Sequence, residues 1–114
     1  MIIVTGTVRA RPDTIDEVEA LSLEHVRRSR QEPGCISHSV HRDLEDRLRL
    51  VFVEWWADTD ALLAHFGVEE SAGFVTAVGA LTDEPPGLSV YAAEEVPLRD
   101  LAPGSRPPDG SGTA

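Results

Sequence analysis

The stretch RLVFVEWWADTDALLAH, residues 49–65, decides the fold of this chain. Its first eight residues alternate between two sets of side chains that are both largely apolar, a pattern typical of a strand buried on both faces. Asp58 then stands where a helix N-cap is preferred, and Leu62 and His65 follow at helical spacing. The stretch therefore predicts a strand that leads directly into a short helix.

The sequence on either side of this stretch supplies the remaining elements. Alternating β-branched residues predict strands, apolar residues at helical spacing predict helices, and Pro-Gly pairs separate them. The additional elements are a strand over 2–10, a helix over 14–31, a strand over 35–42, a helical segment over 70–81 and a strand over 88–96. The order β-α-β-β-α-β is the ferredoxin-like α+β arrangement with an antiparallel sheet.

Length and composition indicate one small domain with a tail. A chain of 114 residues with 41% apolar residues suits a single domain, which we place at 1–98. Residues 99–114 are rich in Pro, Gly, Ser and Asp and are predicted to be disordered. The predicted helices cover only one face of the sheet, so the strand over 49–56 needs a second subunit to cover its other face. We therefore expect a homodimer.

Charge and cysteine content exclude several classes of partner. The net charge of -10 disfavours nucleic acid and anionic membrane surfaces, which carry the same sign of charge. No apolar run approaches the roughly 18 residues of a membrane span. Cys35 is the only cysteine, so it has no internal disulfide partner, and no signal peptide is evident. These observations predict a reduced, cytoplasmic protein.

Three short motifs carry a resemblance to a known family. They are EPGC at residues 32–35, HRD at 41–43 and EWWADTDALLAH at 54–65, and the third is the most specific. Together they resemble the antibiotic biosynthesis monooxygenase (ABM) domain, and the likeness spans about residues 1–96. The resemblance implies a dimeric α+β barrel, in which two sheets face each other and a pocket lies between each sheet and its own helices.

The same resemblance implies oxygenation of a small aromatic or polyketide-like molecule without metal or flavin. Ground-state oxygen is a triplet and reacts poorly with closed-shell molecules, so the substrate itself must donate electrons as a phenolate or hydroquinone anion. Such an enzyme needs a base, an anion-stabilising donor and a dry aromatic pocket. Haem-degrading relatives use a helical histidine as iron ligand, but Val78 stands at that place. No cofactor is expected.

Histidines are the candidate catalytic residues. His65 follows the motif strand on a short helix, and imidazole suits a general base at neutral pH. His38 lies on the face of its strand that also carries Ile36 and Val40, where ABM relatives often have tyrosine, and it is the second candidate. A structural role, as a buried and hydrogen-bonded histidine, is the alternative for His65, and His38 is an interface polar group if its face meets the dimer partner.

The remaining histidines, His25 and His41, are interpreted as core or surface hydrogen-bonding groups. No histidine pair has a metal-binding spacing such as HxH or HExxH, and Cys35 lacks a second thiol, so no metal site is predicted.

Aromatic residues are the candidate substrate contacts. Trp56, Phe66 and Phe74 can form a wall for a flat ligand, with Tyr91 or an arginine as hydrogen-bond donor. Core packing is the competing role for Trp56. The sequence thus predicts a cofactor-independent monooxygenase, with a non-catalytic ligand-binding dimer and a cyclase or isomerase on the same fold as alternatives.

Overall fold

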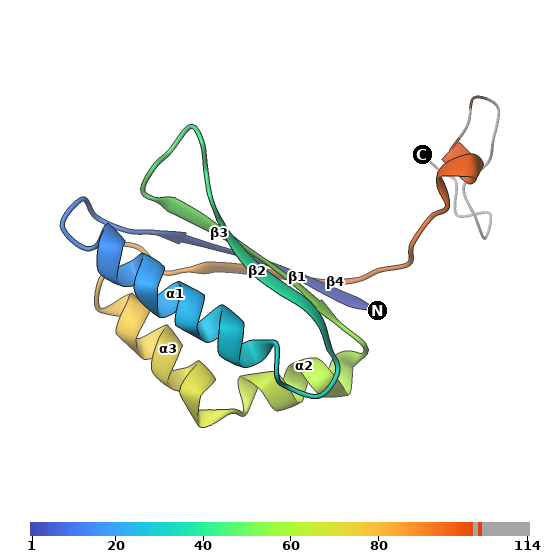
Figure 1. The fold of residues 1–114 in the computed structure, drawn as a ribbon, viewed down its shortest axis with the longest axis horizontal. Helices are drawn as coiled ribbons and strands as arrows, with labels where there is room; N and C mark the ends of the chain where they lie inside the picture. Colours follow the sequence, from blue (N-terminus) through green and yellow to red (C-terminus); the bar gives the residue numbers. More distant parts are fainter. Residues whose placement is uncertain (102, 104–114) are drawn as a thin grey trace.

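A computed structural model describes residues 1–101 and 103, and its architecture is the predicted α+β fold (Figure 1). The elements are β1 (Ile2–Arg9), α1 (Ile15–Ser29), β2 (Cys35–Arg42), β3 (Arg49–Trp56), α2 (Thr59–Phe66), α3 (Glu69–Gly79), β4 (Gly87–Ala92) and a short 3-10 helix, η1 (Leu98–Leu101). The sheet has the order β2-β3-β1-β4, and every pairing is antiparallel. All three α-helices lie on one face of the sheet (Figure 1).

The side chains of strand β3 point alternately to the two faces of the sheet. Phe52 and Trp56 are buried toward the helices, whereas the adjacent Trp55 is 40% exposed on the opposite face. The neighbouring strands follow the same alternation. Ile3 of β1 pairs with both Trp55 and Tyr91, so these three side chains lie on the face away from the helices. The face away from the helices therefore carries large apolar side chains that nothing in the described chain covers.

A β-bulge at the start of β2 corrects one detail of the sequence interpretation. Cys35 pairs with Trp56 and Ser37 pairs with Trp55, so Ile36 is the extra residue between them. Ile36 was expected to share a face with His38, but it is 56% exposed. A bulge places two residues opposite one and shifts the alternation locally. His38 lies beyond it, pairs with Glu54, and is buried toward the helices.

The core between sheet and helices has two parts. The larger part joins α1 and α3 to the middle of the sheet through Val8, Ala10, Val18, Val26, Leu50, Phe52 and Val78. The smaller part lies under α2 and contains Val4, Trp56 and Leu62. Helix α2 begins as its sequence predicts, because the Asp58 side chain accepts a hydrogen bond of 2.8 Å from the backbone N–H of Ala61.

Gly34 fixes the position of the turn between α1 and β2. Its φ of 81° lies in the left-handed region, and a Cβ there would stand 2.5 Å from Cβ of Ala61 on α2. We expect Gly34→Ala to lower the free energy of unfolding by at least about 2 kcal/mol, from backbone strain and the clash together. Gly73→Ala is the matched control, because its Cβ meets only open space in a helix. Urea unfolding that gave equal stabilities for wild type and Gly34→Ala would contradict this.

The C-terminal segment 99–114 is predicted to be disordered. Helix η1 occupies its start, and residues 102 and 104–114 lie outside the described residues.

Within the described part of the chain, no helix combines the length and the apolar character that crossing a bilayer requires.

Candidate active site

A cavity of about 310 Å³ lies between the helix-covered face of the sheet and helices α2 and α3. Most of its lining is apolar and comes from Val8, Phe52, Phe74, Val75, Val78 and Leu88. Its polar lining includes His25, Glu54, His65 and Ser71. The Ser71 hydroxyl is buried and has no hydrogen-bond partner among the described residues. An apolar cavity with a few convergent polar groups is the usual form of a small-molecule site.

His65 is held by a carboxylate from the turn that follows α1. Its Nδ1 lies 2.9 Å from Oε1 of Glu32, and the imidazole is almost fully buried. A carboxylate only accepts hydrogen bonds, so Nδ1 carries the proton and Nε2 keeps a free lone pair. Nε2 in turn lies 3.9 Å from Oε1 of Glu54. Two carboxylates thus face the ring, Glu32 from the turn after α1 and Glu54 from β3.

His25 is held in the opposite tautomer by Arg28, which lies one turn further along α1. An Arg28 guanidinium nitrogen is 2.8 Å from Nδ1 of His25, and guanidinium can only donate, so the neutral ring carries its proton on Nε2. The same guanidinium donates to Oε2 of Glu32 at 3.1 Å. His25, Arg28, Glu32 and His65 therefore form one continuous network. One end of the network is the N–H on Nε2 of His25, and the other end is the lone pair on Nε2 of His65.

Glu54 is buried beside these rings at the centre of the sheet. Trp56 Nε1 donates to its Oε1 at 3.0 Å, and Nε2 of His38 lies 3.4 Å from the same oxygen. Burial, the largest single influence, raises the pKa of Glu54, but the contacts with His38 and Trp56 and the nearby His65 together outweigh it and hold the pKa below its usual value. Glu54 is therefore an anion inside the fold.

Burial, followed by the neighbouring His38, His65 and Arg28, lowers the pKa of His25 to about 3. The ring also stacks on Phe74, with centroids 4.1 Å apart and planes 8° from parallel. His25 is thus a neutral imidazole at physiological pH, and a neutral imidazole with a fixed N–H is a hydrogen-bond donor for an oxygen that becomes anionic.

The low pKa of His25 predicts a specific acid sensitivity. Between about pH 6.5 and about pH 3 the unfolded chain protonates this histidine and the folded chain does not, so stability falls as the pH falls, by about 1.4 kcal/mol per pH unit from this residue. His25→Phe removes that contribution and keeps an aromatic ring against Phe74. Urea unfolding between about pH 5.5 and about pH 4.5 measures the difference, and an equal pH slope in both proteins would show that His25 is not held neutral.

The structure gathers some of the residues predicted from the sequence and separates others. His65, Phe66 and Phe74 line the cavity, and His38 lies behind it, 1% exposed, with its ring centroid 5.6 Å from that of His65. Trp56 is fully buried outside the lining, where it packs on His65 with ring centroids 4.6 Å apart. Tyr91 shares the uncovered face of the sheet with Trp55 and is 53% exposed. Neither Trp56 nor Tyr91 is placed to contact a ligand in this cavity.

Three residues of the network, His25, Arg28 and Glu32, were absent from the sequence-based site. The signal available for His25 was its place on the buried side of α1, between the fully buried Ser22 and Ser29. A polar stripe on a buried helix face indicates partners inside the fold. Glu32 belongs to the EPGC motif, but its partner is 33 residues away, so local sequence gives no sign of the pairing.

Comparisons with known proteins agree with this fold. The family profile described as "Antibiotic biosynthesis monooxygenase" matches residues 1–77. The uncharacterised protein sll1783 of Synechocystis sp. is 34% identical over 94 residues, which are 82% of this chain and 64% of sll1783, so the chain spans somewhat less than two thirds of that curated relative.

Two solved structures have the same fold. One from Deinococcus radiodurans, which carries the same family name, superposes with a TM-score of 0.82 at 24% identity and covers 85% of this chain and 96% of its own. Another, described as an antibiotic biosynthesis monooxygenase, has a TM-score of 0.77 at 29% identity and covers 83% and 100%. The chain belongs to the antibiotic biosynthesis monooxygenase family.

Proposed function

We propose that this protein is a cofactor-independent monooxygenase that oxidises a small hydroquinone or a related phenolic, polyketide-like aromatic molecule in the cavity beneath α2 and α3. The observation that carries the proposal is the pair of histidines among the cavity's polar groups. One presents a lone pair, fixed by Glu32, and the other presents an N–H, fixed by Arg28. A phenolic hydroxyl that enters this space meets a base and an anion-stabilising donor together.

In the proposed reaction, Nε2 of His65 takes the hydroxyl proton of the substrate. The resulting imidazolium is stabilised by Glu32 and Glu54, and the phenolate oxygen accepts a hydrogen bond from Nε2 of His25. A bound aromatic substrate displaces water from the apolar walls, which strengthens both interactions. The family's name and the cavity's lining support this assignment.

The phenolate then supplies the electrons that oxygen requires. Transfer of one electron gives superoxide and a substrate radical, and their recombination forms a carbon–oxygen bond as a peroxide. Cleavage of the peroxide leaves one oxygen atom on the ring as a carbonyl of the quinone, and the other departs as water with two substrate hydrogens. A hydroquinone thereby becomes a hydroxyquinone, and the substrate is the only reductant.

Oxygen uptake with a panel of hydroquinones and anthrones tests the proposal. We expect uptake well above the buffer rate for at least one compound, with loss of that activity in Gly6→Leu. Gly6 lies on the cavity lining, where an added Cβ fits at 3.5 Å from its neighbours and a longer side chain fills the space. Gly6→Ala is the control that keeps the space. Uptake at the buffer rate across the panel would remove the proposal for these substrates.

The same base and donor also suit an isomerase or cyclase, because the pair provides proton transfer and anion stabilisation whether or not oxygen takes part. Exchange of substrate protons with deuterated solvent under nitrogen, without oxygen uptake in air, would favour that function. Binding without either reaction would favour a ligand-binding protein.

The uncovered face of the sheet supports assembly as a homodimer. Ile3, Val53, Trp55 and Tyr91 lie on this face, and no helix of the described chain covers it (Figure 1). Two copies that place these faces together would bury an apolar surface and form the barrel that the family resemblance implies. In such a dimer both faces of β3 become buried, which agrees with its doubly apolar sequence.

Val53→Glu tests this arrangement, because a two-fold axis brings two new carboxylates into one apolar interface. We expect wild type to sediment at about twice its chain mass of 12.4 kDa, and Val53→Glu to sediment as a single chain with unchanged helical circular dichroism. A wild type that remains a 12.4 kDa particle at micromolar concentration would contradict the homodimer.

A further inference from the structure

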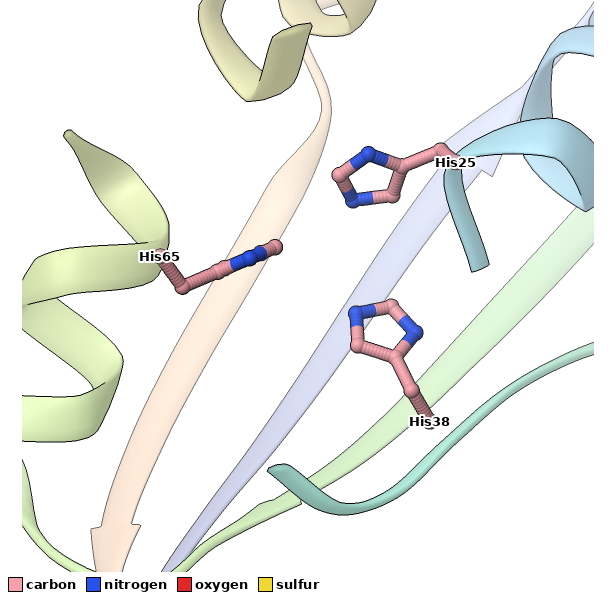
Figure 2. A group of neighbouring side chains, drawn as sticks. All are labelled: His25, His38 and His65. Atoms are coloured by element: carbon pink, nitrogen blue, oxygen red, sulfur yellow. The ribbon is translucent and has the colours of Figure 1, made fainter. Parts of the chain in front are cut away.

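Three imidazoles converge beside the cavity from three different elements. His25 comes from α1, His38 from β2 and His65 from α2, and one ring nitrogen of each lies within 4.8 Å of the other two. All three residues are buried, and Figure 2 shows the rings turned toward a shared central space. The ring nitrogen of His25 that does not contact Arg28 points into that space (Figure 2).

His38 is the member of the cluster that the proposed oxygenation leaves without a role. Its side chain is fully buried, and neither ring nitrogen has a hydrogen-bond partner among the described residues. The 3.4 Å approach of Nε2 to Glu54 is an electrostatic contact that favours the carboxylate but is too long and poorly aligned to count as a hydrogen bond. A buried polar group without hydrogen-bond partners destabilises the fold, so the His38 ring is suited to hold a ligand.

The donor set matches a first-row transition metal. Neutral imidazole is a preferred ligand of Zn²⁺, Co²⁺, Ni²⁺ and Cu²⁺. At metal–nitrogen distances of about 2.1 Å, tetrahedral ligands stand about 3.4 Å apart, so small ring movements bring nitrogens that lie within 4.8 Å into place. Nδ1 of His65 already donates a hydrogen bond to Glu32. A carboxylate in this position is the usual outer partner of a metal-binding histidine. The Glu54 anion offsets part of the metal charge.

We infer that His25, His38 and His65 form a binding site for one divalent first-row transition metal ion, with an open coordination position facing the cavity. His25 must move its proton from Nε2 to Nδ1, and Arg28 must then release that nitrogen and keep its bond to Glu32. Metal and the proposed base function exclude each other, because both use the lone pair on Nε2 of His65. The metal site goes beyond the proposed function and does not depend on it.

Cobalt is the probe for this site, because Co²⁺ bound by three histidines in a near-tetrahedral site absorbs strongly in the visible. The 114-residue protein is stripped with a chelator and titrated with Co²⁺, then with Zn²⁺ by calorimetry, near neutral pH. We expect one ion per chain, visible ligand-field bands that Zn²⁺ displaces, and a rise in Tm with Zn²⁺. His38→Phe and His25→Phe are expected to weaken binding at least about 100-fold and to abolish the bands.

His41→Gln is the matched control, because His41 lies on the same strand as His38 but is exposed and outside the cluster. It is expected to bind as wild type does. Circular dichroism establishes whether each variant is folded. If both cluster variants unfold, the ligand-field bands and the Tm rise of wild type at one metal ion per chain test the site alone. Absence of bands in wild type, or equal binding by wild type and a folded His38→Phe, would overturn the inference.

Discussion

Oxygen consumption by a His65→Gln variant is expected to show a kcat/KM about 10²–10⁴-fold below that of wild type with the best substrate of the hydroquinone panel. Glutamine can still donate to Glu32, so the turn between α1 and β2 keeps its contact with α2. Its amide cannot take up a proton at neutral pH. The variant therefore isolates the loss of the base from the loss of the fold.

Two observations accompany this measurement. Substrates whose hydroxyl is already ionised in solution are expected to lose less activity, because they need no base, and this separates proton removal from binding. His41→Gln, which changes an exposed histidine, is expected to retain wild-type activity. Equal kcat/KM values for wild type and a folded His65→Gln would assign the base to another group.

Removing the N–H donor gives the second large effect. His25→Phe is expected to lower kcat by about 10²–10³-fold, the usual consequence of deleting one donor to a developing oxyanion. Phenylalanine keeps the stacking on Phe74, so the cavity wall is retained and KM is expected to change little. A variant that raised KM and left kcat unchanged would show that His25 only binds the substrate.

Arg28 offers a finer version of the same test. Arg28→Gln retains a side chain that can donate to Nδ1 of His25, whereas Arg28→Met cannot. If the tautomer of His25 matters, kcat should fall further in Arg28→Met than in Arg28→Gln. Equal rates in the two variants would mean that the network does not orient His25.

The sequence predicts the architecture well because the strongest patterns are local. Strands β2 and β3 begin and end at the predicted residues, 35–42 and 49–56, because a turn or a helix cap bounds each of them. Strand β4 ends at Ala92 instead of 96, since the following residues have no partner strand in the described chain. The bulge at Ile36 could not be anticipated, because it depends on the pairing of β2 with β3.

The site is predicted less completely, because its contacts join distant parts of the chain. His65 follows from the motif that contains it, and its place at the cavity follows from the helix. Its partner Glu32, and the approach of His25 and His38, depend on how three elements pack, and no spacing in the sequence encodes that. The same dependence on packing leaves the proposed metal site without a metal-binding spacing in the sequence.

Trp56 illustrates how one residue type serves two roles. Its place at the end of β3 made it a candidate wall for an aromatic ligand. In the fold its indole N–H is hydrogen-bonded to Glu54 and its ring lies against His65, so it positions the site from behind. A buried tryptophan satisfies its N–H wherever it packs, and only the three-dimensional structure distinguishes wall from support.

A crystal structure of the protein with a bound hydroquinone, grown without oxygen, tests the central claim most directly. We expect a substrate hydroxyl within hydrogen-bond distance of Nε2 of both His65 and His25, with the ring against the apolar walls of the cavity. A hydroquinone bound on the opposite face of the sheet, or bound in the cavity with its hydroxyls away from both histidines, would contradict it.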